Sequence, residues 1–302
     1  MSKLITVFGA TGNQGGSVIK HILADSTLSK TFKVRAITRD TSKPAAQALA
    51  KQGVELKSAD LSDKASVTEA LQGSDTVFLV TNYWESAKYD VEFGQGKNVA
   101  DASKELGVRH LIFSSLLHVG KTTNGRLTHV PHFEAKADIE EYIKRIGVPA
   151  SFYLAGYFMS NFTQSVQKGE DGSLSFAFPV SQGAKFPLID IAEDTGKFVN
   201  GILKNRDATL NKHILGAENY YTPEQIRSGL EAATGKKTHY AQVSDEQYKG
   251  FLPDFIAEEM LENHQFIDEP GYYNGAGLDE SHGIVEDKLV TWKEFVRKSG
   301  AF

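Results

Sequence analysis

Three glycines, spaced three residues apart, stand near the start of the chain in the run GATGNQG at residues 9–15. The run follows the apolar residues 4–8 and precedes a segment with helical periodicity. Glycines permit a tight turn and a close approach of a ligand to the backbone, and the N-terminus of a following helix offers unpaired N–H groups. This order of strand, turn and helix predicts a site for the pyrophosphate of a dinucleotide. The residues expected to contact it are Gly9, Thr11, Gly12, Asn13, Gln14 and Gly15.

The end of the second apolar segment, at residues 37–40, indicates which dinucleotide binds. A carboxylate at this place would hydrogen-bond the ribose 2′-OH of NAD. The chain has Arg39 here, whose guanidinium has the charge and geometry to pair with a 2′-phosphate. We therefore expect NADP(H). The alternative interpretation is that Arg39 is a solvated loop residue and that Asp40 binds a ribose hydroxyl.

Polar residues at the ends of two further apolar segments extend the predicted cofactor site. Asp60 and Leu61 follow the third segment, at the place that lines the adenine pocket in chains of this topology. Asp60 is alternatively the N-cap of a helix over residues 64–71. Thr81, Asn82 and Tyr83 follow the fourth segment, at the sheet edge where open α/β folds bind ligands. The aromatic residues 83 and 84 belong either to a ligand wall or to the core.

The elements that position these residues alternate between short β-rich runs and helix-length amphipathic segments. This alternation predicts an α/β fold of the Rossmann type, with a doubly wound parallel sheet and helices on both faces. This alternation ends after about residue 155. We therefore expect a dinucleotide-binding domain over residues 1–154 and a smaller α/β lobe over residues 155–302. The expected strands are residues 4–8, 33–38, 55–57, 76–80, 110–114 and 150–153, and the expected helices are residues 15–24, 43–51, 64–71, 95–106, 133–145, 193–203, 223–234, 251–266 and 292–299.

Composition excludes several classes of function. The formal net charge is −5 and the basic residues are scattered, whereas binding to a phosphate backbone needs a concentrated positive surface. Direct nucleic-acid binding is therefore not expected. The chain contains no cysteine and no apolar stretch near the roughly 18 residues that span a bilayer. His118, His129 and His132 have no carboxylate partner at ligand spacing, so no metal site is expected. A cytoplasmic location is expected, and a nuclear one in addition to it.

Over essentially its whole length the chain resembles the NmrA-like family of atypical short-chain dehydrogenase/reductases. Residues 9–18 are similar to the family's nucleotide loop, and residues 37–39 to its NADP-selective strand end. Residues 80–86, 132–136 and 147–149 are similar to the redox-sensor (HSCARG-like) branch of the family. The resemblance implies NADP(H) binding, in some members with a regulatory output. It also implies that Tyr157 lies in a loop beside the nicotinamide, although Ala155 stands where the family usually has a proline.

The resemblance also raises the question of catalysis. Short-chain reductases commonly use a tyrosine for proton transfer and a lysine four residues later on the same helix face. Lys136 fits the lysine, but the position four residues earlier is His132. Lys136 can hydrogen-bond the nicotinamide ribose or act alone as the acid–base group, and His132 is either a proton donor or a helix-start residue without a role in catalysis. Ser114 and Ser115 either position a ligand or simply end the fifth strand.

An intact glycine loop beside a missing tyrosine favours a protein that binds NADP(H) without consuming it. We expect a redox-sensing regulatory protein whose affinity for a partner protein changes with cofactor occupancy, which requires that the cofactor bind two conformations unequally. The alternative is an NADPH-dependent reductase of a small carbonyl or unsaturated compound that uses Lys136, with Ser115 or His132. A scaffold that binds no nucleotide is a third hypothesis, and a homodimer is a further expectation.

Overall fold

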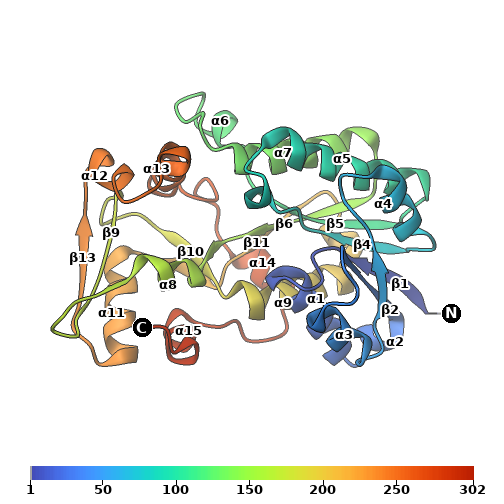
Figure 1. The fold of residues 1–302 in the computed structure, drawn as a ribbon, viewed down its shortest axis with the longest axis horizontal. Helices are drawn as coiled ribbons and strands as arrows, with labels where there is room; N and C mark the ends of the chain where they lie inside the picture. Colours follow the sequence, from blue (N-terminus) through green and yellow to red (C-terminus); the bar gives the residue numbers. More distant parts are fainter. Residues whose placement is uncertain (1) are drawn as a thin grey trace.

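The computed structural model describes residues 2–302 and is built around a seven-stranded sheet (Figure 1). Its strands are β1 (Lys3–Val7), β2 (Phe32–Thr38), β3 (Glu55–Ser58), β4 (Thr76–Leu79), β5 (His110–Ser115), β6 (Ala150–Ala155) and β11 (His213–Gly216). They lie in the order β11-β6-β5-β4-β1-β2-β3, and every neighbouring pair is parallel. The chain winds outward from β1 to β3 and then outward again from β4, so the order reverses between β1 and β4. The predicted Rossmann-type sheet is confirmed.

Helices cover both faces of this sheet (Figure 1). Helices α4 (Lys64–Leu71), α5 (Tyr89–Glu105) and α7 (Pro131–Ile146) cover one face, and α1 (Asn13–Ala24), α2 (Leu28–Thr31), α3 (Pro44–Ala50) and α9 (Ile191–Lys204) cover the other. Every residue of β4 and β5 is buried as a result, which is typical of a parallel sheet with two covered faces. On β1, the alternate residues Ile5 and Val7 both pack in the layer of α1 and α9.

The large sheet takes its last strand from the second half of the chain. After β6 the chain leaves the sheet, returns through α9, which packs along α1, and then adds β11 beside β6. The backbone N–H of Gly196 in α9 donates to Ser17 Oγ of α1 at 3.0 Å, so the two helices approach closely. Strand β11 had no counterpart among the expected strands. The domain boundary after residue 154 stays a prediction, because the sheet uses chain from both sides of it.

A second lobe contains two three-stranded sheets, in the orders β12-β10-β7 and β13-β9-β8, around an aromatic core. The expected helices 223–234 and 292–299 form with those bounds, and Thr222 and Gln225 make the reciprocal capping box at the first of them. Across residues 2–302, no helix is both long and apolar enough to cross a membrane. The strands of the lobe are β7 (Tyr157–Phe158), β8 (Gln167–Lys168), β9 (Leu174–Phe178), β10 (Phe186–Ile189), β12 (Asn219–Tyr221) and β13 (Thr238–Gln242). Its principal helices are α8 (Phe162–Ser165), α11 (Pro223–Thr234), α12 (Asp245–Lys249), α13 (Asp254–Asp268) and α15 (Trp292–Ser299).

Candidate dinucleotide-binding site

The glycine loop joins β1 to α1 at the point where the sheet order reverses, which is where open α/β sheets bind ligands. Gly9 adopts a φ of +63°, and a Cβ on it would lie 2.7 Å from Val80 Cγ1. A Cβ on Gly15 would lie 2.4 Å from the carbonyl oxygen of Gly9. The Gly12 N–H donates to that same oxygen at 2.9 Å and closes the turn. Position 9 therefore favours glycine because of its positive φ and its close approach to Val80, and position 15 requires it because a side chain there would force the turn open.

The N-terminus of α1 fits an anion such as a pyrophosphate. Its N-cap residue is Gly12, which has no side chain to bond the N–H groups of the first turn. Thr11, Gly12 and Asn13 are exposed and Gln14 is half-buried, so a ligand can reach this loop from solvent. Backbone donors at the positive end of a helix dipole suit a phosphate without any cationic side chain.

The end of β4 lies beside this loop because β4 neighbours β1 in the sheet, and β5 is the next strand beyond β4. Ser114 at the end of β5 donates from its hydroxyl to Gln14 Oε1 at 2.8 Å. Thr81 follows β4 and is buried, whereas Asn82 is exposed. The structure thus brings the predicted cofactor residues of three separate segments to one edge of the sheet.

Arg39 lies just beyond β2 with 70% of its side chain exposed, and it forms an ion pair with Glu85 of the 3-10 helix η1 (Tyr83–Glu85). The neighbouring Asp40 turns away from it. Its carboxylate accepts hydrogen bonds from the Ser42 hydroxyl at 2.6 Å and the Ser42 N–H at 2.9 Å, which lower the pKa of Asp40. Both charges are exposed, and each has a partner: Glu85 for the Arg39 guanidinium and Ser42 for the Asp40 carboxylate.

Asp60 and Leu61 follow β3, as expected, with Asp60 exposed and Leu61 half-buried. The Asp60 carboxylate accepts from the Ser62 N–H at 2.8 Å and so shapes the loop. The N-cap of α4 is Asp63, which accepts from the Ala65 N–H at 2.9 Å. The alternative interpretation of Asp60 as this N-cap is therefore wrong, because the helix begins only at residue 64 and an N-cap side chain reaches no further than the first turn.

Lys136 lies on the inward face of α7 and is fully engaged by acceptors. Its ammonium donates to Thr81 Oγ1 at 2.8 Å, to the Thr81 carbonyl at 3.1 Å and to Glu92 Oε1 at 2.6 Å. An ammonium has three donors, so none is left over. Only 13% of the lysine side chain and 1% of that of Glu92 are exposed. The second carboxylate oxygen of Glu92 is buried and has no hydrogen-bond partner within residues 2–302.

His132, one turn earlier on α7, is held by two residues of α13. Its Nδ1 lies 2.5 Å from Glu259 Oε1, and its backbone N–H donates to the same oxygen at 3.1 Å. Its Nε2 lies 3.1 Å from Asn263 Nδ2. The Glu259 carboxylate can only accept and the Asn263 NH₂ can only donate, so Nδ1 of His132 is the donor and Nε2 is the acceptor. Both ring nitrogens of His132 are therefore occupied in the interface between α7 and the second lobe.

Glu140 lies two turns after His132 on α7, and it contacts Ser115 at the end of β5. The Ser115 hydroxyl is fully buried and donates to Glu140 Oε2 at 2.6 Å. Burial opposes the charge on Glu140, but hydrogen bonds from His213, Lys144 and Ser115 hold the pKa of this carboxyl below its usual value. The three residues proposed for proton transfer, Lys136, His132 and Ser115, thus each contact a buried carboxylate.

The two aromatic residues after β4 occupy different environments. Tyr83 is buried, and its hydroxyl donates to Glu259 Oε2 at 3.4 Å. Trp84 is 48% exposed, and its ring centroid lies 5.0 Å from that of His132. Tyr157 is buried with its hydroxyl 3.4 Å from His264 Nε2, and burial raises the pKa of this phenol. The Tyr157 side chain is therefore part of the hydrophobic core.

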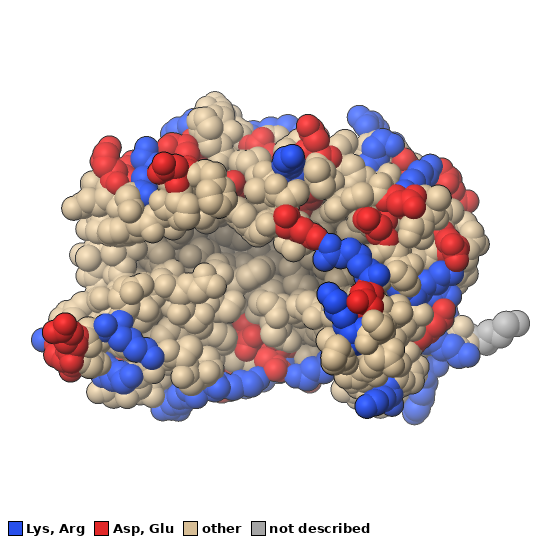
Figure 2. All heavy atoms as spheres, viewed as in Figure 1, with Lys and Arg blue, Asp and Glu red and all other residues tan. Residues whose placement is uncertain are grey.

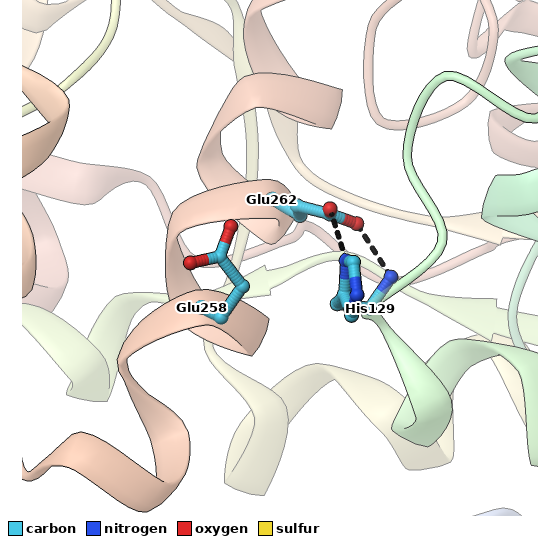
Figure 3. A group of neighbouring side chains, drawn as sticks. All are labelled: His129, Glu258 and Glu262. Carbon is cyan, nitrogen blue, oxygen red and sulfur yellow. Dashed lines mark hydrogen bonds and ion pairs between the residues drawn. The ribbon is translucent and has the colours of Figure 1, made fainter.

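Carboxylates of α13 are the functional-site residues that sequence reasoning missed. The sequence showed no carboxylate at ligand spacing from His118, His129 and His132, but in the structure each of them contacts one: Glu134 for His118, Glu262 for His129 and Glu259 for His132. The backbone N–H of His129 donates to Glu262 Oε2 at 2.6 Å, and its Nδ1 lies 2.6 Å from Glu262 Oε1. Figure 3 shows both contacts as dashed lines. Glu258, one turn earlier on α13, also faces His129, and ligand atoms of the three residues lie within 4.8 Å of one another. Since His129 Nδ1 already contacts Glu262, this arrangement is an ion pair with a second acid beside it.

A hollow on one face of the molecule leads to this sheet edge. In Figure 2 it separates the part formed by α12 and α13 from the part formed by α8 and α15, and residues other than Lys, Arg, Asp and Glu line most of it. Acidic and basic side chains meet at the end of the hollow that lies over the large sheet. The face therefore offers an uncharged groove beside a charged edge.

Fold and loop geometry together define a protein of the dinucleotide-binding Rossmann class. The model of the NmrA-like family matches residues 1–296, and the chain belongs to that family. A relative from Malbranchea aurantiaca, the NmrA-like family domain-containing oxidoreductase malD, is 37% identical over 259 residues, which cover 80% of this chain and 76% of malD.

Solved structures share the fold at low sequence identity. NmrA, a negative transcriptional regulator, in complex with NADP has a TM-score of 0.82 at 21% identity, covering 98% of this chain and 95% of NmrA. NmrA is also known in complex with NAD. The Citrobacter sp. triphenylmethane reductase complexed with NADP(H) has a TM-score of 0.79 at 21% identity, covering 98% of this chain and 99% of the reductase. One fold thus carries both a regulator and a reductase.

Proposed function

We propose that this chain is an NADP(H)-binding, redox-sensing regulatory protein whose affinity for a partner protein changes with cofactor occupancy. The observation that carries the proposal is the contrast within one site. The glycine loop is open to a pyrophosphate, whereas Lys136 has each of its donors engaged by Thr81 and Glu92 and the position of the usual tyrosine is His132. The similarity of residues 80–86 and 132–136 to the redox-sensor branch agrees with this reading.

The preference for NADP(H) rests on Arg39. This guanidinium stands beyond the end of β2, where the adenosine ribose of a Rossmann cofactor lies, and it is 70% exposed. A bidentate charge-assisted pair with the 2′-phosphate suits its planar donors. NmrA has been solved with NADP and with NAD, so the fold accepts both cofactors. The preference of this chain must therefore be measured directly.

A route for a regulatory output runs through His132. The backbone and ring of this residue contact Glu259 and Asn263 of α13, while Lys136 on the next turn holds Thr81 beside the predicted cofactor site. A cofactor that shifts the Thr81 segment therefore acts on the helix that joins the two lobes. Occupancy shifts a conformational equilibrium only if the cofactor binds the two conformations unequally.

Two measurements test the proposal. Calorimetric titration with NADPH, NADP+ and NADH should show binding, with the 2′-phosphate compounds favoured. Hydrogen exchange of the backbone amides of α13 should then differ between the free and the NADPH-bound protein. A second copy of the chain is the first partner to examine, by light scattering with and without NADPH. Equal exchange and equal association in all cofactor states would contradict a regulatory role.

A reductase is the second candidate, favoured by the name oxidoreductase that malD carries at 37% identity. In this proposal Lys136 is the acid–base group, with Ser115 or His132, and a small carbonyl or unsaturated compound of low charge binds in the uncharged hollow (Figure 2). NADPH oxidation with a panel of such compounds tests it. If no compound raises oxidation above background and Lys136→Ala alters only cofactor affinity, the reductase proposal fails.

A further inference from the structure

Arg39 and Glu85 form an ion pair between two segments that border the predicted cofactor site. Arg39 follows β2, and Glu85 lies in the turn after β4, so the pair joins opposite sides of the β1 loop in the strand order. The proposed function assigns the Arg39 guanidinium to the 2′-phosphate of NADP(H). A carboxylate and a phosphate compete for the same planar set of donors, since both are bidentate partners of arginine.

The turn that carries Glu85 adopts an unfavourable backbone conformation. Ala87 has a φ of +50°, in the left-handed region that non-glycine residues rarely occupy, while its N–H donates to the Tyr83 carbonyl at 2.8 Å. Such a residue persists only where the surrounding contacts hold it. The contacts of this turn include the pair with Arg39 and the packing of Tyr83 and Trp84 around His132 and Glu259.

We infer that Glu85 is a specificity-determining residue, which occupies Arg39 in the cofactor-free protein and is displaced by the 2′-phosphate of NADP(H). The inference rests on the proposed function, because it assumes that Arg39 receives this phosphate. Displacement removes one of the contacts that hold the turn at residues 82–88. NAD(H), which lacks the phosphate, leaves the pair intact, so the turn responds to one cofactor and not to the other.

The response reaches the lobe interface through two rings. Tyr83 contacts Glu259 of α13 through its hydroxyl, and the Trp84 ring lies against His132, which Asn263 of α13 also holds. A change in this turn is therefore a change in the surface between α7 and the second lobe. Binding of the 2′-phosphate therefore alters the contacts with the second lobe, whereas binding of the pyrophosphate alone does not.

Cofactor affinity tests the competition. Glu85→Gln should tighten NADP+ binding by about twofold to fivefold, the contribution of an exposed ion pair, and leave NAD+ binding unchanged. Glu105→Gln is the matched control, because Glu105 is 53% exposed against 48% for Glu85 and pairs with Lys64 at the far end of α5. Unchanged or weaker NADP+ binding in Glu85→Gln would overturn the inference.

Trp84 fluorescence tests the response of the turn. The chain has two tryptophans, and Trp292 is 1% exposed, so acrylamide quenching above the background of a Trp84→Phe variant reports on Trp84. Saturating NADP+ should raise this quenching in the natural chain and NAD+ should not, while free Glu85→Gln should already match the NADP+-bound state. Equal quenching by both cofactors, or an unchanged free variant, would contradict the inference even if Glu85→Gln binds NADP+ more tightly.

The same titrations separate the two proposals. If calorimetry shows no NADP+ binding, the proposed function and the inference both fall. If NADP+ binds and the hydrogen exchange of α13 changes, but the quenching of Trp84 does not, then only the role of Glu85 is overturned.

Discussion

The glycine loop and the inward face of α7 border the same sheet edge but present opposite chemistry. The loop offers backbone N–H groups with no side-chain partner at its cap and is exposed at Thr11, Gly12 and Asn13. The α7 face offers His132 and Lys136, both bonded to buried carboxylates. Binding therefore relies on preformed backbone geometry, whereas proton transfer would require buried ion pairs to be broken first.

This difference separates cofactor binding from turnover. A loop made of glycines binds a pyrophosphate whether or not a proton donor stands nearby. The pair of Lys136 with Glu92 joins α7 to α5 and to the strand end at Thr81, which is a structural role. The predictions that follow test whether the two regions are as independent as their contacts indicate.

The largest effect should follow from breaking the Lys136 pair. Lys136→Met should destabilise the protein by about 3–5 kcal/mol, because it leaves Glu92 as an uncompensated buried charge. Urea unfolding measures the loss. Lys136→Met combined with Glu92→Gln should recover most of it, since the charge is then gone. A fully stable Lys136→Met would show that the pair with Glu92 does not hold α7 in place, and the contrast between the glycine loop and α7 would fail.

Gly15→Ala should weaken NADP+ and NAD+ alike, by at least about tenfold. The added Cβ would lie 2.4 Å from the Gly9 carbonyl oxygen and must open the turn that both cofactors share. Gly94→Ala in α5 is the control, because nothing lies within 4 Å of the Cβ it adds. Calorimetry of both variants checks the result, and retained binding in Gly15→Ala would mean that the pyrophosphate lies elsewhere.

Arg39→Ala should weaken NADP+ by about tenfold or more and leave NAD+ nearly unchanged. A charge-assisted contact contributes about 1.5–3 kcal/mol, and only NADP+ has the phosphate that makes it. Titration of both cofactors against the variant decides the matter. Equal losses for the two would remove the assignment of the 2′-phosphate to Arg39.

Local patterns along the chain predicted the loop and the strand ends well. Gly9, Gly15 and Arg39 lie where the spacing placed them, because a Rossmann nucleotide loop is a contiguous strand, turn and helix. The alternative that made Asp60 the N-cap of α4 was wrong by three residues, because Asp60 and Asp63 both precede the helix closely and Asp63 is the cap.

Long-range pairs were beyond prediction. The carboxylates that engage His129 and His132 lie 133 and 127 residues further along the chain, and no periodicity in α13 marks Glu259 or Glu262 as partners. Strand β11 was missed for a related reason, because its four residues join the sheet only through pairing with β6. Lys136 was placed correctly on its helix, but the acceptors that engage it come from two other elements.

The smallest effect concerns His129, which joins the segment before α7 to α13. Its hydrogen bond to Glu262 raises the pKa of the imidazole above the usual 6.5. A raised pKa in the folded protein means that the pair stabilises fully below pH 6.5 and that this stabilisation is lost as the pH rises through the raised value. The side chain is 64% exposed, so the contribution is about 0.2–1 kcal/mol. Unfolding free energies of the natural chain and His129→Gln should differ at low pH and converge at high pH. A difference that persists unchanged at high pH would show that the backbone bond to Glu262, and not the imidazole charge, links α13 to α7.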